Sequence, residues 1–564
     1  MNLPVAQVSA DSASSAQGAA SPRSDDRKRF IVETSRPFCR SRIWQLQDTY
    51  FAERGVEAWR QGEVPHYVTS NPTIANAYAE IVFAFRADLA RLAPPGGRDD
   101  PLTICELGAG SGRFAFHFLR RLEHLCANSD VAPEAFRYVL TDVADTNLEF
   151  WRTHPCFQPY IERGLLDMAR FDAMEPGALA LQVSGTTVAA GSLRAPLVVI
   201  GNYLFDSIPP DLFYLKQERG WRCLVSLSVD EEPAALNAAD LLAKLKVHYE
   251  YEEIAAAPDA VPCYEESWLQ ELLAEYRGAL QDSHLSFPAS GLRCLQSLAA
   301  LSQQGLLVLS ADKGEHRLER LDGRAAPDLV RHGSVSMSVN YHAFTRMCER
   351  RGGMALVPAY GHRSIDVVGL LMVPEADRFA ATRRAYQGHV QQFGPDGFFT
   401  VSRHARAHIP QMSVDDILAY LRLSHHDSHL LARYLPRLMD LAADFDEPTR
   451  HDVTEALEKV WDCYFPLGEE LDLANGIAAL LYAIDDYPRA LAFFQTSMQI
   501  YGPDTGTLYN IAACFQGLGE DATAAAMLRK VLEYDPGNEP ARMMLAECEG
   551  DAVKIEPERA ANLG

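Results

Sequence analysis

The chain has 564 residues, of which 48% are hydrophobic and 23% charged. This is the composition of an ordinary globular protein, and it excludes a wholly disordered, collagen-like or coiled-coil chain. At about 150 residues per domain, the length predicts three to four domains, or one large domain with appendages. The formal net charge of −24 repels phosphate and no long Lys/Arg cluster offsets it, so no nucleic-acid partner is expected.

Neither a membrane segment nor a metal site is predicted. No run approaches about 18 consecutive apolar residues. Residues 1–28 are rich in Ala and Ser without the pattern of a secretory signal, so we expect a disordered leader. The eleven cysteines are scattered without a CxxC pair, which favours a reducing, cytoplasmic setting. His425, His426 and His429 share one predicted helical stretch, but no HExxH motif completes a metal site, so we interpret them as a solvent-exposed helix face.

The segment 29–100 is predicted to consist of helices and connecting loops. Apolar residues recur at helical spacing from Ile74 to Leu92, and Pro94-Pro95-Gly96-Gly97 then ends the pattern.

The segment 101–400 predicts an α/β domain with a Rossmann-like, mostly parallel sheet. Short β-rich runs alternate with helical stretches, as in βαβ units. The runs are Leu102–Leu107, Tyr138–Thr141, Leu197–Ile200, Leu306–Leu309 and Ile365–Val373. The long connection near 228–300 is expected to hold inserted helices or a lid.

The segment 411–555 is predicted to be all-α. Ser413 and Asp416 have the spacing of a helix start. Small and apolar residues recur at a period of 34: Ala478, Ala512 and Ala546, with Ile477, Ile511 and Leu545 beside them. This period resembles that of tetratricopeptide repeats, and Asp535-Pro536-Gly537-Asn538 resembles their inter-repeat turn. A plain helical bundle with accidental spacing is the alternative.

A glycine loop carries the main chemical signal. The predicted strand ending at Glu106-Leu107 is followed by Gly108, Gly110, Ser111 and Gly112, and then by a helix. Glycines let the backbone turn tightly and touch a ligand, and a helix N-terminus adds free N–H groups. The missing GKS/GKT excludes a P-loop, and GxGxG followed by Arg113 departs from the GxGxxG of hydride-transfer Rossmann folds. A structural turn is the alternative.

The pattern from Glu106 to Gly112 resembles motif I of class I S-adenosylmethionine-dependent methyltransferases. The resemblance implies S-adenosyl-L-methionine as cofactor, with the loop holding its amino-acid end and Glu106 reaching the ammonium side. Asp142 ends the next predicted strand, where its two oxygens suit two ribose hydroxyls, although a strand-end cap is also consistent. The segment around Asp172 resembles the one that contacts adenine, and a surface turn fits it equally well.

The stretch from Pro196 to Pro209 contains Asn202, Tyr203 and Asp206. It resembles the Asn-Glu-x-x-Asp-x-x-Pro segment of MidA-like methyltransferases, the family of the mitochondrial complex I assembly-factor methyltransferase. Further pieces of that family's pattern follow in the same order, covering about 60–375: His66–Ser70 with Thr69, Gly305–Asp312 and His332–Phe344. The resemblance implies methyl transfer to a protein side chain, of arginine type, and a cofactor contact at Thr69 and Asn202.

Tyr203 departs from the family pattern, because a phenol cannot supply the charge with which a carboxylate orients a guanidinium. Methyl transfer is an in-line displacement that depends mainly on positioning. We therefore expect Asn202 and Asp206 to orient the acceptor, with Tyr203 as a wall or hydrogen-bond partner. Asp312 and His342 are weaker candidates, for which a structural role is the alternative. Phe114 either stacks near the sulfonium or belongs to the core.

Three functions remain open at this level. The chain is a methyltransferase whose C-terminal repeats recruit a protein or peptide, a non-catalytic scaffold that retains the fold, or a methyltransferase for a small metabolite with repeats that form a homodimer.

Overall fold

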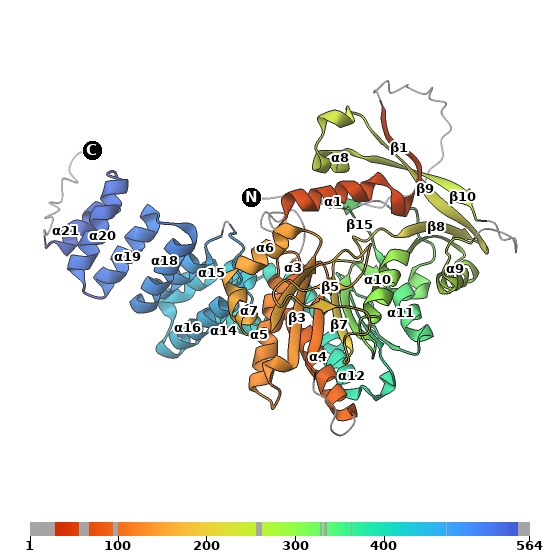
Figure 1. Cartoon of the computed structure of the whole chain (residues 1–564). Helices are drawn as coiled ribbons and strands as arrows, with labels where there is room; N and C mark the ends of the chain where they lie inside the picture. Colours follow the sequence, from red (N-terminus) through yellow and green to blue (C-terminus); the bar gives the residue numbers. More distant parts are fainter. Residues whose placement is uncertain are drawn as a thin grey trace.

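The computed structural model describes residues 29–55, 67–93, 100–254, 262–327, 330–331, 335–362, 364–469 and 471–550 (Figure 1). The predicted leader 1–28, the break at Pro94–Gly97, and the family-like residues His66 and 332–334 lie outside the described residues.

A seven-stranded sheet forms the centre of the molecule. Its strand order is β17-β18-β12-β7-β2-β3-β4. The bounds are β17 Met354–Leu356, β18 Asp366–Met372, β12 Leu306–Asp312, β7 Leu197–Asn202, β2 Leu102–Glu106, β3 Phe136–Asp142 and β4 Leu166–Arg170. β18 is antiparallel to both neighbours, and the remaining pairs are parallel. The predicted α/β class, the mostly parallel sheet and the five predicted strands are therefore confirmed.

Helices cover both faces of this sheet, which explains why its strands are continuous apolar runs. Ile104 and Val198 pack on one face, whereas their neighbours Cys105 and Val199 pack on the other. The first face is covered by α4 (Pro72–Leu92), α5 (Arg113–Ala127) and α12 (Ala380–Tyr386), and the second by α10 (Ala289–Ala299) and α11 (Tyr341–Arg350). α9 (Ser267–Ala279) belongs to the apolar cluster of the second face. The predicted helix from Ile74 to Leu92 is confirmed.

A second, antiparallel sheet corrects two predictions. Its order is β1-β9-β8-β11, and β10 also pairs with β9. The strands are β1 Phe30–Pro37, β8 Asp211–Lys216, β9 Arg219–Val229, β10 Lys246–Glu253 and β11 Asp282–Phe287, and α1 (Arg42–Arg54) and α8 (Ala238–Lys244) pack on them. The segment 29–100 is thus not purely helical, and the insertion near 228–300 contains strands as well as helices. β1 lacks a regular apolar alternation and is held by pairing with distant β9, which propensity cannot predict.

The C-terminal part of the described chain is all-helical, as predicted, and extends away from the sheet (Figure 1). Its helices are α14 Val414–Leu423, α15 Ser428–Leu441, α16 Glu447–Asp462, α17 Leu473–Ala483, α18 Tyr487–Tyr501, α19 Thr505–Gly517, α20 Asp521–Tyr534 and α21 Glu539–Cys548. Ser413 caps α14 and forms a capping box with Asp416, which confirms the predicted start.

The histidines near 425 do not share one helix face. His425 and His426 have φ values of +55° and +61° and form the turn between α14 and α15, whereas His429 lies on α15. None of the described helices combines the length and apolarity that crossing a membrane requires.

Candidate functional site

The glycine loop lies where the sheet order reverses, between β2 and β7, at the carboxyl ends of both strands. Gly108, Gly110 and Gly112 have φ values of +61°, +56° and +78°. A Cβ atom at Gly112 would lie 2.9 Å from the ring of Phe157, and one at Gly108 would lie 3.1 Å from Leu204 Cδ1. Conformation thus requires glycine at all three positions, and neighbouring side chains leave no room for a Cβ atom at Gly112 and little at Gly108.

Asp142 fixes this loop to the end of β3. Its Oδ2 accepts the Gly110 N–H at 3.0 Å and its Oδ1 accepts the Ala144 N–H at 3.0 Å. Burial raises the pKa of this carboxyl, while the hydrogen bonds from the Ala144 and Gly110 N–H groups oppose the rise. The Asn147 side chain, on α6 (Asp145–Thr153), is buried and makes no hydrogen bond to the described residues. Asp142 therefore does act as a strand-end cap, and it retains lone pairs beside an unpartnered amide.

Glu106 is buried at the end of β2. Its Oε2 accepts the Tyr138 hydroxyl at 2.8 Å. Burial raises the pKa of Glu106 to about 8, against the lowering effect of Tyr138. Ser111 Oγ accepts the Arg113 N–H at 3.4 Å, within the loop itself. Glu106 and Ser111 thus lie at the predicted loop, where both also make contacts that stabilise the fold.

Asn202 holds the end of β7 in place. Its Oδ1 accepts the Tyr78 hydroxyl at 3.0 Å and the Ala311 N–H at 3.1 Å, and its Nδ2 donates to the Thr69 carbonyl at 3.3 Å. Thr69 lies on α3 (Tyr67–Ser70). The structure therefore brings the predicted residues Asn202 and Thr69 together, with the Asn202 amide engaged by the protein.

Tyr203 follows β7 with a φ of +48°, a conformation that costs a non-glycine residue about 1–2 kcal/mol. Tyr203 and Lys313 both line a cavity of about 370 Å³. The other residues that line this cavity are Val68, Gly314, Ser338, His362 and Ser364. Burial and the neighbouring Asp312 and Asp206 raise the pKa of the phenol, so Tyr203 stays neutral. Tyr203 is thus a wall of this cavity.

Asp206 and Asp312 form a buried carboxyl pair beside Tyr203. Burial raises the pKa of Asp206 to about 6, against the lowering effects of Ser207 and Lys313. Burial and the charge of Asp206 raise the pKa of Asp312 well above its ordinary value. Asp312 Oδ2 accepts the Phe205 N–H at 3.2 Å, whereas Oδ1 is buried without a hydrogen-bond partner in the described chain. Burial and the proximity of the two carboxyls thus both favour a protonated form of the pair.

Three predicted residues lie apart from this group. Asp172 is exposed, and its Oδ1 accepts the Met174 N–H at 2.8 Å, as in a surface turn. His342 contacts the Tyr276 hydroxyl at 2.8 Å and lines a different cavity. Phe114 is buried in the core, with its ring 5.6 Å from that of Tyr78.

The C-terminal helices contact the glycine loop's helix directly, which the sequence did not predict. Arg113, the first residue of α5, forms an ion pair with Glu469 and lies 3.0 Å from His429 Nε2. His154 stacks on Phe465 with ring centroids 4.1 Å apart. The sequence indicated this contact in one way only: Arg113 occupies the position at which a dinucleotide-binding loop has its third glycine. Asn147 carried no signal at all.

No family model matches the chain, and no curated protein matches it. Among solved structures, it is similar to an uncharacterized protein from Burkholderia thailandensis, at 15% identity and a TM-score of 0.35, over 62% of this chain and 82% of that one. A member of the same superfamily from that organism, bound to S-adenosyl-homocysteine, is 16% identical with a TM-score of 0.32, over 58% and 75% of the chains. Phosphoethanolamine N-methyltransferase 1 of Haemonchus contortus is 9% identical with a TM-score of 0.22, over 84% and 83%. Likenesses this remote assign no activity.

Proposed function

We propose that this protein is an S-adenosyl-L-methionine-dependent methyltransferase whose cofactor lies along the carboxyl ends of β3, β2, β7 and β12. The observation that carries the proposal is the pair of unpartnered buried groups on either side of the glycine loop: the Asn147 amide beside Asp142, and Oδ1 of Asp312. An unsatisfied buried polar group costs about 1–3 kcal/mol, and a ligand with hydroxyl and ammonium groups offsets that cost. The sulfonium of the cofactor supplies an activated methyl group.

The chain's own residues divide the cofactor site between them. Asp142 and Asn147 hold the ribose hydroxyls, and the bare backbone from Gly108 to Gly112 admits the methionine part. Adjacent strands lie about 4.8 Å apart, so the ends of β3 and β12 are separated by about 14 Å, which leaves room for an extended nucleoside and amino acid. Glu106, Thr69 and Asp172 are the remaining predicted contacts.

The acceptor in this proposal is a protein or peptide side-chain nitrogen of arginine type. The Asp206 carboxylate attracts and orients a cationic group, because a charge-assisted hydrogen bond is about twice as strong as a neutral one. Asp206, whose pKa is about 6, accepts the proton that the methylated nitrogen releases. Tyr203 forms part of the cavity wall, and Asn202 positions the end of β7.

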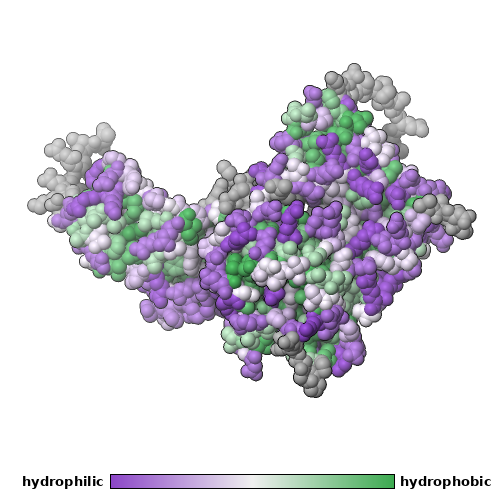
Figure 2. Space-filling model, in the orientation of Figure 1, coloured by the Kyte–Doolittle hydropathy of each residue, from purple (hydrophilic) through white to green (hydrophobic). Residues whose placement is uncertain are grey.

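The C-terminal helices recruit the substrate in this scheme, as tetratricopeptide-like repeats. The large side chains that they expose include Tyr482, Ile500, Tyr501, Leu518, Tyr534 and Met543. Figure 2 shows hydrophobic areas, in green, among the hydrophilic surface of this part of the molecule. Helix pairs of this kind stack into surfaces that bind peptides. The free thiols of all eleven cysteines support a cytoplasmic setting.

A non-catalytic scaffold is the second candidate, and Tyr203 favours it. The family that the chain resembles has glutamate at this position, and here the phenol is neutral. The Asn202 amide is also already engaged by three hydrogen bonds.

Labelled methyl transfer to arginine-containing peptides tests the proposal. We expect incorporation by the full chain, a loss with Asp206→Asn, and no change with Asp282→Asn, whose side chain is exposed on β11. The rate is expected to fall below pH 6, where Asp206 takes up a proton. Cofactor binding without transfer to any peptide would favour the scaffold. Transfer to a small molecule after truncation at about residue 410 would select a metabolite acceptor.

A further inference from the structure

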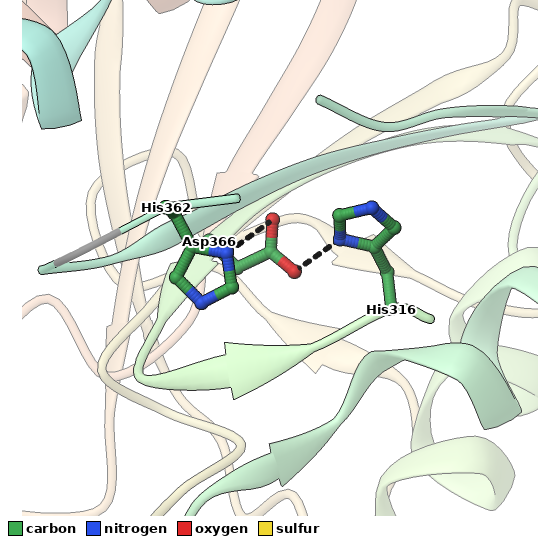
Figure 3. A group of neighbouring side chains, drawn as sticks. All are labelled: His316, His362 and Asp366. Atoms are coloured by element: carbon green, nitrogen blue, oxygen red, sulfur yellow. Dashed lines mark hydrogen bonds and ion pairs between the residues drawn. The ribbon is translucent and has the colours of Figure 1, made fainter. Parts of the chain in front are cut away.

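His316 and the pair His362 and Asp366, which are four residues apart, come together from two segments of the chain (Figure 3). His316 directly follows β13 (Gly314–Glu315), His362 lies in the loop before β18, and Asp366 is the first residue of β18. One potential ligand atom from each residue lies within 4.8 Å of the others. Among the described residues, this is the group of histidine and carboxylate side chains arranged to hold a metal ion.

Two potential ligand atoms of this cluster are hydrogen-bonded to each other, and two are not hydrogen-bonded. His316 Nδ1 and Asp366 Oδ2 are 2.6 Å apart, which is a hydrogen bond. His362 Nδ1 and Asp366 Oδ1 are 3.7 Å apart, too far for a hydrogen bond, and both atoms are buried without any other partner in the described chain. An unsatisfied pair of this kind in a native structure indicates an unseen water or ion.

The 3.7 Å separation fits two ligands of one ion. Zinc binds nitrogen and carboxylate oxygen at about 2.0–2.2 Å, so two ligands at a tetrahedral angle lie about 3.4 Å apart. Binding would exchange the hydrogen bond between His316 and Asp366 for bonds to the ion, and would satisfy both orphaned atoms.

The electrostatic surroundings favour a cation. The Asp366 carboxyl is fully buried. It lies directly across the β12–β18 pairing from Asp312, so two acidic side chains occupy facing positions on adjacent strands. A buried cation beside Asp366 supplies the compensation that a buried carboxylate requires.

The cluster lies between two cavities. His362 lines the cavity of about 370 Å³ that contains Tyr203 and Lys313. His316 lines a second cavity of about 540 Å³, with Tyr276 and His342 among its walls. Three protein ligands leave a fourth position for water or a ligand group, as in catalytic rather than structural zinc sites.

We propose that His316, His362 and Asp366 bind one divalent transition-metal ion, Zn²⁺ or Fe²⁺, whose open position faces the cavity beside Tyr203. Imidazole with a single carboxylate suits these ions, whereas Mg²⁺ and Ca²⁺ require mostly oxygen ligands. The ion would bind an oxygen or nitrogen group of whatever molecule enters that cavity. The site itself does not depend on methyl transfer.

Titration of the full-length, chelator-treated protein with Co²⁺ alone tests the site, in the absence of any methyl donor. We expect one equivalent to bind with the visible absorption of a four-coordinate site, and Zn²⁺ to displace it. Zn²⁺ should also raise the thermal unfolding midpoint, because it binds only the folded chain. The absence of a cobalt band would overturn the proposal without relying on any variant.

Two variants and one control locate the ion. His362→Gln and His316→Gln are each expected to weaken binding at least tenfold. His404→Gln is the matched control. His404 is exposed on α13 (Pro395–Arg406), and its ring centroid lies 4.9 Å from that of exposed His408. Binding that persists unchanged in His362→Gln, or that is lost in His404→Gln, would contradict the assignment. Binding of S-adenosyl-L-methionine is measured separately on the metal-free protein. Cofactor binding without metal binding would contradict the metal site alone and leave the proposed methyltransferase function intact.

Discussion

Gly112→Ala tests whether the side chains packed against the glycine loop, Phe157 and Trp151, require glycine at position 112. The φ of +78° makes any L side chain unfavourable, by about 1–2 kcal/mol. The new Cβ would lie 2.9 Å from Phe157 Cε2 and 3.1 Å from Trp151 Cδ1, well inside the ordinary carbon–carbon contact of about 3.5–4.0 Å. Overpacking of this kind costs about 1–3 kcal/mol more. We therefore expect a total loss of about 2–5 kcal/mol of unfolding free energy.

Gly164→Ala is the matched control. Its φ is +71°, but a Cβ atom there would meet nothing within 4 Å. It should lose only the conformational part, about 1–2 kcal/mol. Urea denaturation of both variants under the same conditions measures the difference. Equal losses in the two variants would refute the claim that the rings of Phe157 and Trp151 close over the loop.

Three further predictions concern residues around the loop. Glu106→Gln removes an acid whose pKa is about 8 in the folded state, so the folded chain keeps a proton that the unfolded chain releases near pH 4.5. The wild type therefore loses stability as the pH rises from 5 to 8, and the variant should be more stable by about 2–4 kcal/mol at pH 8 but nearly equal at pH 5 in urea denaturation; a difference independent of pH would contradict this. Asn202→Ala removes three hydrogen bonds and should cost about 2–3 kcal/mol by the same method, and a loss below about 0.5 kcal/mol would show that these bonds do not hold β7. Arg113→Ala removes the ion-pair partner of partly buried Glu469, so limited proteolysis should cut the C-terminal helices faster, whereas an unchanged pattern would count against their docking on α5.

The sequence predicted those elements whose cause is local. The strands around Leu102–Glu106 and Leu197–Asn202 are buried on both faces and therefore appear as apolar runs. The strand Phe30–Pro37 has no such run, because its stability comes from pairing with β9, far along the chain. The inserted strands near 228–300 were missed for the same reason.

The same distinction applies to the site. The glycine loop was predictable because its spacing lies within one short segment, and Asp142 because it ends a strand that the apolar run itself indicates. His316, His362 and Asp366 carried no signal, since only the folding of β13, β18 and the loop between β17 and β18 brings them together. Asn147 was missed because only the structure shows that its buried side-chain amide has no hydrogen-bond partner in the described chain.

Calorimetric titration of the full-length chain with S-adenosyl-L-methionine tests the central claim most directly. We expect one equivalent to bind, and Asp142→Ala to weaken the affinity at least tenfold, which is about 1.4 kcal/mol. Asp145→Ala, which changes an exposed carboxylate three residues away, should bind like the wild type. No binding at high micromolar cofactor, or equal affinity in the two variants, would contradict a nucleoside held at the end of β3.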